Sequence, residues 1–434
     1  MTLFWRSLAL TIAISVLNGC TVNPVTGKQQ FSLVSAQQEV AIGAKQYGSG
    51  QQSQGGLYYI DPGVQAYVSE VGQKLARVSD RPQLPYEFVV LNNSVPNAWA
   101  LPGGKIAINR GLLTLLEDES ELAAVLSHEI VHAAARHGAS QMTRGMLAGI
   151  GLQVLSTATN NNAVGGLAAQ LGTSAWMARY GRSAELESDT YGMEYMVRAG
   201  YDPHGAVMLQ KKFVELSKKR QQGSMSTLFA SHPPSQERVS ANQTKAATYP
   251  GSGLINRKEF LRKVSRIKKD LPAYQAQDKA MKALRGKNPR KALDLLDESI
   301  RIQPGEGQFW ELRGHAWKML GKQNKAIQAF STAIKKNPDY FSHYLARGVE
   351  YFEQDKLSTA QRDLEKSRRL LPTPVSSLYL GDIAAAKDDK QSALSYYRAA
   401  AGAKGQVGEE ARAKLAALEI GTLPGQSVAA KLSL

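Results

Sequence analysis

The stretch SHEIVHAAARH, residues Ser127–His137, decides which fold and chemistry the rest of the chain must support. Within it, His128 and His132 stand four positions apart. On an α-helix such residues lie one turn apart on the same face, so both imidazoles can reach one ion. Glu129 lies beside them, where its carboxylate could take a proton from an attacking water. H-E-x-x-H therefore predicts a metal site on a helix; the alternative is a surface helix that happens to carry histidines.

A catalytic zinc ion requires a third protein ligand, and the segment RSAELESD (182–189) offers one. Glu185 and Asp189 again stand four positions apart, on one helical face. Glu185 would complete a His-His-Glu set. Asp189 would accept a hydrogen bond from the far nitrogen of His128 and hold its tautomer. The alternative is an acidic helix face that pairs with neighbouring arginines.

Four stretches together resemble the HtpX and CaaX-prenyl-protease family of gluzincin zinc metallopeptidases. They are LAAVLSHEIVHAAARHG (122–138), GRSAELESD (181–189), NAWALPGG (97–104) and FASHPPSQERV (229–239). The resemblance implies endopeptidase activity with one Zn²⁺ per chain. The roles that it implies are metal ligation by His128, His132 and Glu185, proton transfer by Glu129, and support of a ligand by Asp189.

His232 and Arg238 lie in the last of these stretches, and each allows more than one role. His232 could donate a hydrogen bond to the oxyanion of the reaction. It could instead bind the metal as a further ligand and keep the enzyme latent, as the resemblance implies, or it could merely cap a helix. Arg238 could support the catalytic site or pair with Glu185 or Asp189. We expect His137, at the end of the active helix, to interact with the helix dipole rather than with the metal.

The segment Asn97–Gly104 is a candidate for substrate binding. An exposed strand through Asn97, Ala98, Trp99 and Ala100 could pair with an extended substrate backbone, which would bind a polypeptide without reading its sequence. The alternative is a buried hairpin with a Pro-Gly-Gly turn.

The N-terminus predicts export and a lipid anchor. MTLFWR is short and basic, and SLALTIAISVL is an apolar run of signal-peptide length, too short for an ordinary membrane span. Next comes LNGC, whose Cys20 is the only cysteine, so an internal disulfide is excluded. LNGC resembles the bacterial lipobox, which implies lipidation of Cys20; a plain signal peptide is the alternative. Thr21 after the cysteine implies anchoring in the outer membrane, on the periplasmic side.

Residues 272–420 contain a repeat of tetratricopeptide length. An interval of 34 residues separates the members of three sets: Pro304, Pro338 and Pro372; Ala292, Ala326 and Ala360; Leu296, Phe330 and Leu364. Gly314 and Gly348 share this interval. A fourth copy is shifted by one residue, and a capping helix follows near 408–419. This period is typical of pairs of antiparallel helices that stack into a solenoid and bind proteins in a concave groove.

Patterns elsewhere predict further elements. We expect helices over 35–47 and 62–78, a strand at 86–93, and a hairpin around Pro102–Gly104. The active helix should run from about Asp118 to His137, with Gly138 as its stop. Residues 145–175 could form a flexible cover over the site or two small core helices.

The chain is expected to divide into six parts. They are a signal peptide (1–19), a lipid-anchored tether (20–32), a zinc metallopeptidase domain (33–250), a basic linker (251–271), a tetratricopeptide domain with its capping helix (272–420) and a tail (421–434).

Positive charge is concentrated in the C-terminal part. From residue 251 onward there are 33 Lys+Arg and 20 Asp+Glu, a surplus of 13, whereas the first 250 residues carry 20 and 17. Such a surface suits acidic proteins or anionic lipids. Because the chain is expected to be exported, we expect no nucleic acid among its partners.

The sequence thus predicts a mainly α chain: a zincin-type α+β metalloprotease domain, with an active-site helix and a small sheet, followed by an α-solenoid of tetratricopeptide repeats. This order resembles BepA-like periplasmic β-barrel assembly-enhancing proteases and implies quality control of envelope proteins. The expected partners are polypeptide substrates, envelope proteins or outer-membrane assembly machinery at the repeats, and the membrane through the anchor. The rival prediction is a chaperone or scaffold whose zinc site is latent or vestigial.

Overall fold

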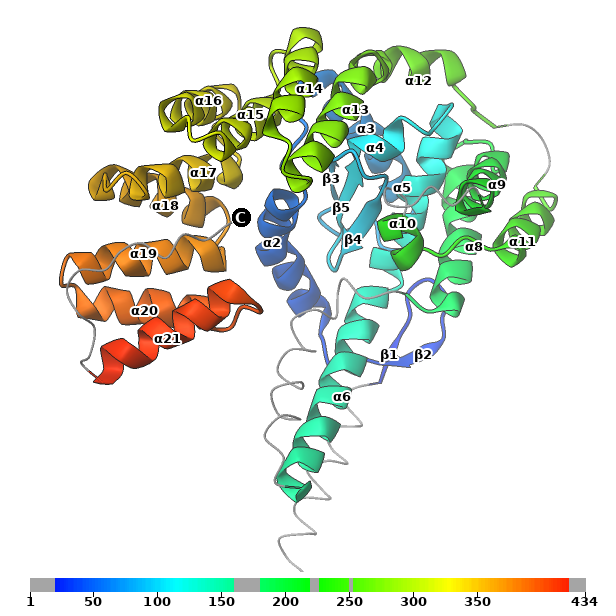
Figure 1. Ribbon diagram of the computed structural model, residues 1–434. Coiled ribbons are helices and arrows are strands. Elements are labelled where there is room, and N and C mark those ends of the chain that lie inside the picture. The colour runs from blue at the N-terminus through cyan, green and yellow to red at the C-terminus, as the bar shows by residue number, and fades with distance from the viewer. Residues whose placement is uncertain (1–19, 160–179, 219–225, 250–252, 421–434) are drawn as a thin grey trace, which may run out of the picture. The chain divides into compact units, whose positions relative to one another are not determined.

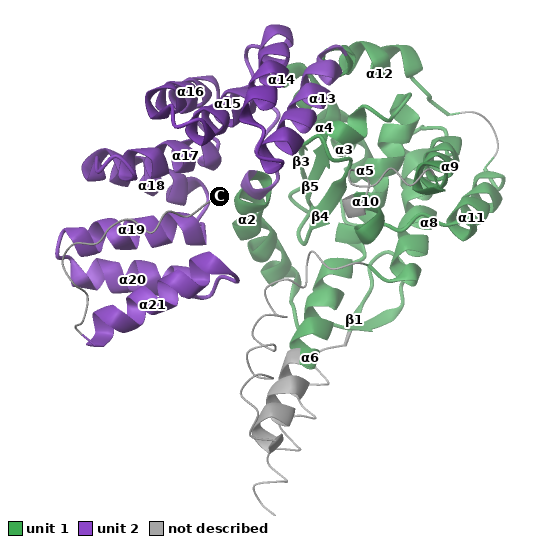
Figure 2. Cartoon of the chain, in the orientation of Figure 1, with its two compact units in different colours: residues 1–51, 61–268 green, residues 52–60, 269–434 purple. Residues whose placement is uncertain are grey.

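A computed structural model describes residues 20–159, 180–218, 226–249 and 253–420. The expected signal peptide, the expected tail and much of the segment 145–175 lie outside these residues. The chain separates into two compact units (Figure 2). One contains Met1–Gln51 and Asp61–Lys268, and the other contains Gln52–Ile60 and Lys269–Leu434.

The first unit is built around a small sheet that helices cover (Figure 1). Its strands β3 (Glu87–Leu91), β4 (Ala98–Leu101) and β5 (Lys105–Asn109) lie in the order β3-β5-β4. β3 runs parallel to β5, and β4 pairs antiparallel with β5, so the predicted hairpin around Pro102–Gly104 is confirmed. The helices described in this unit are α2 (Ala36–Ser53), α3 (Pro62–Ala76), α4 (Arg110–Leu113), α5 (Glu119–Ala134), α6 (His137–Thr159), α8 (Arg182–Arg198), α9 (His204–Lys218), α10 (Ser226–Ser231), α11 (Gln236–Ala246) and α12 (Arg257–Lys263).

Helix α5 carries H-E-x-x-H and forms the centre of this unit. Asp118 caps its start by accepting a hydrogen bond from the backbone N–H of Glu121. All of its side chains are buried except that of His128, which is partly exposed. α5 packs against α3, α8, α9 and β4. Where α8 crosses it, Gly192 permits a close approach, because a Cβ there would lie 3.2 Å from the backbone nitrogen of His128. The alternative of an exposed surface helix is therefore wrong.

The predicted end of the active helix is wrong. α5 ends at Ala134, Arg136 adopts a left-handed conformation with φ of 62°, and α6 begins at His137 and runs through Gly138. The arginine side chain compensates for this unusual backbone: it donates to Glu39 (2.7 Å), to the Val34 carbonyl (2.6 Å) and to the Thr21 hydroxyl (2.9 Å). These contacts come from distant segments, so the local sequence did not indicate the turn.

The segment expected to be a tether contains a short hairpin. β1 (Cys20–Val22) pairs antiparallel with β2 (Gln29–Phe31). Asn23 closes the turn, since its side-chain Oδ1 accepts from the backbone N–H groups of Val25 and Thr26, at 2.9 and 3.3 Å. β2 also contacts α6. These residues are therefore packed against the peptidase region.

The second unit contains the predicted stack of helix pairs. Its helices are α13 (Ser265–Arg285, which begins in the first unit), α14 (Pro289–Ile302), α15 (Gly307–Met319), α16 (Gln323–Lys336), α17 (Phe341–Phe352), α18 (Leu357–Leu370), α19 (Pro374–Ala386), α20 (Lys390–Ala401) and α21 (Gln406–Ile420). α12 and α13 occupy most of the stretch expected to be a basic linker. The residues Gln52–Ile60 belong to this unit, where the Tyr59 hydroxyl donates to the Gly305 carbonyl at 3.0 Å.

The small and large residues that recur every 34 positions pack against one another within each helix pair. Gly314 and Gly348 leave room for Phe330 and Leu364 of the following helix, because a Cβ at these positions would lie 2.4 and 2.9 Å from those side chains. Gly381 leaves the same room for Tyr397. A mainly α fold with a tetratricopeptide-like solenoid is confirmed.

Glu39 offers a test of how α2 is held to the active helix. It is 1% exposed and pairs with both Arg81 (3.2 Å) and Arg136 (2.7 Å). Glu39→Ala leaves two buried guanidinium groups without this partner, so we expect it to lower the free energy of unfolding by about 3–5 kcal/mol. Urea denaturation measures this, with exposed Glu70→Ala as the control; equal stability of the two variants would contradict the assignment.

Candidate metal centre

His128 and His132 turn their Nε2 atoms toward one point. The two atoms are 3.0 Å apart, and the rings meet at 71°. Both residues come from α5, and His132 is 1% exposed. Burial lowers the pKa of His132 well below its usual value, which favours the neutral imidazole that binds metals.

Glu185 of α8 and His232, which directly follows α10, complete a group of four donors. Glu185 Oε1 lies 3.4 Å from His132 Nε2 and 3.1 Å from His232 Nδ1. His128 Nε2 lies 3.6 Å from Glu185 Oε2 and 3.3 Å from His232 Nδ1. A tetrahedral zinc ion with ligand bonds near 2.0–2.1 Å separates its ligands by about 3.3 Å. The donor set therefore fits zinc in both chemistry and spacing.

Arg238 and Asp189 support this group from behind. Asp189 Oδ1 lies 3.0 Å from His128 Nδ1, the nitrogen that faces away from the other donors. Arg238, on α11, donates to both oxygens of Asp189, at 2.6 and 2.7 Å, and lies 2.8 Å from Glu185 Oε2. It thus pairs with both acids that the sequence offered as alternatives. Burial raises the pKa of Asp189, but the charge and hydrogen bonds of Arg238 outweigh this and hold it below its usual value.

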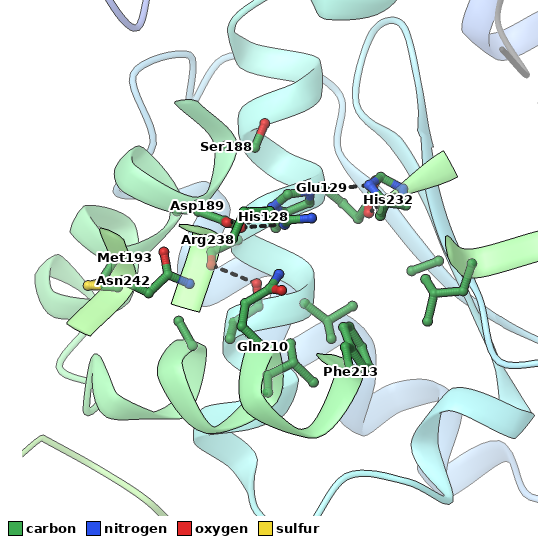
Figure 3. A pocket seen from close by; sticks show the side chains of 18 of the residues that line it. His128, Glu129, Ser188, Asp189, Met193, Gln210, Phe213, His232, Arg238 and Asn242 are labelled. Atoms are coloured by element: carbon green, nitrogen blue, oxygen red, sulfur yellow. Dashed lines mark hydrogen bonds and ion pairs between the residues drawn. The ribbon is translucent and has the colours of Figure 1, made fainter. Parts of the chain in front are cut away.

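Glu129 lies beside the four donors, on the side of His232 (Figure 3). It is 2% exposed, and its Oε2 atom has no hydrogen-bond partner within the described part of the chain. Burial raises its pKa above the ordinary value for glutamate. A buried carboxylate with a free oxygen and a raised pKa accepts a proton more readily than an exposed glutamate does.

The carboxylates of Glu129 and Glu185 require positive charge close by. Burial lowers the pKa of His232, but the charges of these two acids raise it to about 9. A cation at the same point would compensate the two acids in place of the histidine proton. The electrostatics therefore agree with the spacing in favouring a bound metal ion.

Three residues near the centre were missed or misjudged from the sequence. The ring of Tyr180 stacks on His132 at 3.9 Å, and burial raises the pKa of its hydroxyl. His137, expected at a helix C-terminus, instead begins α6 and places Nδ1 2.9 Å from His132 Nδ1. Its Nε2 lies 3.1 Å from Glu187 Oε1. The sequence signal for the role of His137 was the Arg136-His137 pair that follows H-E-x-x-H. This pair could not be interpreted from the sequence, because His137 reaches His132 only through the turn at Arg136.

A pocket continues from the donors into the domain (Figure 3), and its empty space of about 510 Å³ includes the solvent at its opening. Its wall is mainly apolar, with Met193, Phe213 and Leu209 among its residues, and Gln210 and Asn242 add amide groups. Ala98 of β4 also lines it. This is a place where one substrate side chain could be held next to Glu129.

The candidate substrate strand lies at the edge of the sheet order, but its side chains are buried. Asn97, Ala98, Trp99 and Ala100 are 2–9% exposed, and Trp99 packs edge-on against Tyr47. Backbone pairing with a substrate would use the outer edge of β4, not its side chains, so it remains a proposal.

Cys20, the candidate lipidation site, lies at the start of β1. No helix among the described residues is long and apolar enough to cross a bilayer.

Comparisons with known proteins define the class. Residues 62–246 match Peptidase family M48, and residues 345–407 match a tetratricopeptide repeat. The chain therefore carries an M48 metallopeptidase domain followed by tetratricopeptide repeats, which confirms the resemblance seen in the sequence.

Particular proteins are similar to this chain over part of its length. The chain is 25% identical to the beta-barrel assembly-enhancing protease of Escherichia coli (strain K12) over 358 residues, which cover 77% of this chain and 69% of the relative. It is 31% identical to the mitochondrial metalloendopeptidase OMA1 of Schizosaccharomyces pombe over 173 residues, which cover 40% of this chain and 50% of the relative. Among solved structures, MamA from Desulfovibrio magneticus RS-1 aligns at 18% identity with a TM-score of 0.31, over 34% of this chain and 84% of that one.

Asp189 provides a test of the metal site that does not depend on activity. Asp189→Asn keeps an acceptor for His128 but removes the charge that Arg238 pairs with, so we expect zinc affinity to fall about 10- to 100-fold. Competition with a chromophoric chelator measures this. Glu194→Gln, which removes a partly exposed carboxylate farther along the same helix, should leave the affinity unchanged. Loss of affinity in both variants to the same extent would contradict a specific role of Asp189.

Proposed function

We propose that this protein is a zinc-dependent endopeptidase of the bacterial cell envelope. The observation that carries the proposal is the group of four donors whose ligand atoms lie within 4.8 Å of one another, His128, His132, Glu185 and His232, with the buried carboxylate of Glu129 beside it. The M48 match supports a metallopeptidase. Bound zinc would polarise the peptide carbonyl and make the attacking water more acidic.

The protein's own groups would carry the protons. Glu129, with its free Oε2, takes a proton from the attacking water and returns it to the nitrogen of the leaving amine. Arg238 and Asp189 keep His128 and Glu185 in place while the charge at the centre changes. A substrate backbone would lie along the outer edge of β4 and direct one side chain into the adjoining cavity.

His232 would regulate access of water and substrate to the metal. It is 6% exposed and reaches the other donors through Nδ1. A fourth protein ligand occupies the position that a catalytic zinc site keeps for water or substrate. We propose that this arrangement is the latent form and that the loop bearing His232 must move before cleavage. The freed imidazole could then stabilise the oxyanion.

The proposed cellular role rests on the N-terminal sequence and on the repeats. LNGC, whose Cys20 begins β1, supports cleavage of a signal peptide and lipidation of Cys20, with anchoring in the outer membrane on the periplasmic side. The repeats would recruit misfolded or stalled envelope proteins, or the machinery that assembles them; the name of the E. coli relative supports the second partner. Surplus positive charge after residue 251 suits acidic proteins.

The closed donor set also favours a second candidate function. If His232 never leaves, the chain would act as a chaperone or scaffold, and the repeats would do the work. No proposed metal ligand or proton acceptor is missing from the group around Glu129, which favours the enzyme. Whether the loop opens separates the two functions.

Casein cleavage by the full chain purified in detergent tests both. We expect slow cleavage by the parent and faster cleavage by His232→Ala, because the variant frees one ligand position. Glu129→Gln should retain zinc and lose about 10²–10⁴-fold in rate. If the parent and His232→Ala bind zinc but cut no unfolded protein, the enzyme proposal is wrong and the binding function stands.

A further inference from the structure

The two nitrogens of His132 face different partners. Nε2 points toward the donor group, 3.0 Å from His128 Nε2. Nδ1 points away from it, 2.9 Å from Nδ1 of His137. For His132 to bind a metal through Nε2 as a neutral imidazole, its proton must stay on Nδ1. His137 must then accept that proton's hydrogen bond.

This requirement fixes the tautomer of His137 as well. With Nδ1 as the acceptor, its own proton lies on Nε2, and that nitrogen faces Glu187 Oε1 at 3.1 Å. The opposite arrangement would move the proton of His132 onto Nε2 and abolish ligation. The carboxylate of Glu187 thus orients both imidazoles in succession. His128 is held more directly, since Asp189 contacts its Nδ1 without an intermediate.

Glu187 is in turn held by the hairpin at the start of the described chain. Asn23 is 6% exposed, and its Nδ2 donates to Glu187 Oε1 at 3.0 Å. The orientation of this amide follows from its surroundings, because Oδ1 is used by the two backbone N–H groups of its own turn. The bond therefore requires the turn to be formed and docked on α8.

A second contact joins the same hairpin to the same place. Arg136, whose left-handed backbone places His137 behind His132, donates to the hydroxyl of Thr21 in β1. Thr21 thus contacts Arg136 directly, and Asn23 contacts the carboxylate of Glu187, which faces His137. Two separate hydrogen bonds therefore connect the hairpin that begins at Cys20 with Arg136 and Glu187.

We infer that His137 and Glu187 are positioning residues for the metal ligand His132, and that the docked hairpin 20–31 holds them through Asn23. The inference rests on the proposed function in that it takes the four donors as a zinc site. It adds that the segment carrying the proposed lipid anchor is a structural part of the metal centre.

Zinc affinity of the full chain in detergent tests the inference without measuring cleavage. His137→Leu removes both nitrogens, so we expect zinc to bind about 10- to 100-fold more weakly, as for other residues that orient a ligand. His137→Asn places an amide oxygen near the position of Nδ1 and should restore most of the affinity. Glu187→Gln and Asn23→Leu should weaken zinc binding as well, the latter less. His204→Leu, which removes another histidine paired with an acid, serves as the matched control.

Two further readouts separate positioning from general stability. The visible absorption of the Co²⁺-substituted chain should change in His137→Leu and not in His204→Leu, because only the former reorients a ligand. Urea unfolding of the chelator-treated variants reports any loss of stability unrelated to metal. If zinc binds the parent and His137→Leu equally well, or if His137→Asn is as weak as His137→Leu, the inference is wrong. If the parent itself binds no zinc, the proposed function is wrong too.

Discussion

The packing of α8 against α5 is the constraint on which the centre depends. At Gly192 the two helices approach so closely that a side chain would meet the backbone of His128. This approach places Glu185 and Asp189, one helical turn apart, against the histidines of α5. Burying acids costs free energy unless positive groups compensate them. Arg238 provides one such group for both acids, and a metal ion would provide another.

Much of this arrangement could be predicted from the sequence because it depends on helical periodicity. H-E-x-x-H on one helix and Glu185 with Asp189 on another each follow from a spacing of four residues. The 34-residue interval likewise predicted the helix pairs, since Gly314 and Phe330 must meet in any such stack. Where one period governs a segment, local sequence and tertiary structure agree.

Prediction was wrong where contacts between distant segments decide the backbone. The active helix was expected to reach His137, yet α5 ends at Ala134 and the chain turns at Arg136. Glu39, Val34 and Thr21 stabilise that turn, and they lie far away in sequence. The role of His137 depends on this turn, and so no helical pattern could show it. Asn23 was hidden for a similar reason, because a segment rich in Pro, Gly and polar residues was interpreted as a tether.

X-ray absorption at the zinc edge of the zinc-loaded full chain tests the central claim most directly. If His128, His132, Glu185 and His232 hold one ion, the parent should bind one zinc per chain with four nitrogen or oxygen neighbours and the outer-shell scattering of three imidazoles. His232→Ala should lose the scattering of one imidazole and keep the metal. Identical scattering in the parent and the variant, or no stoichiometric zinc in the parent, would contradict the account.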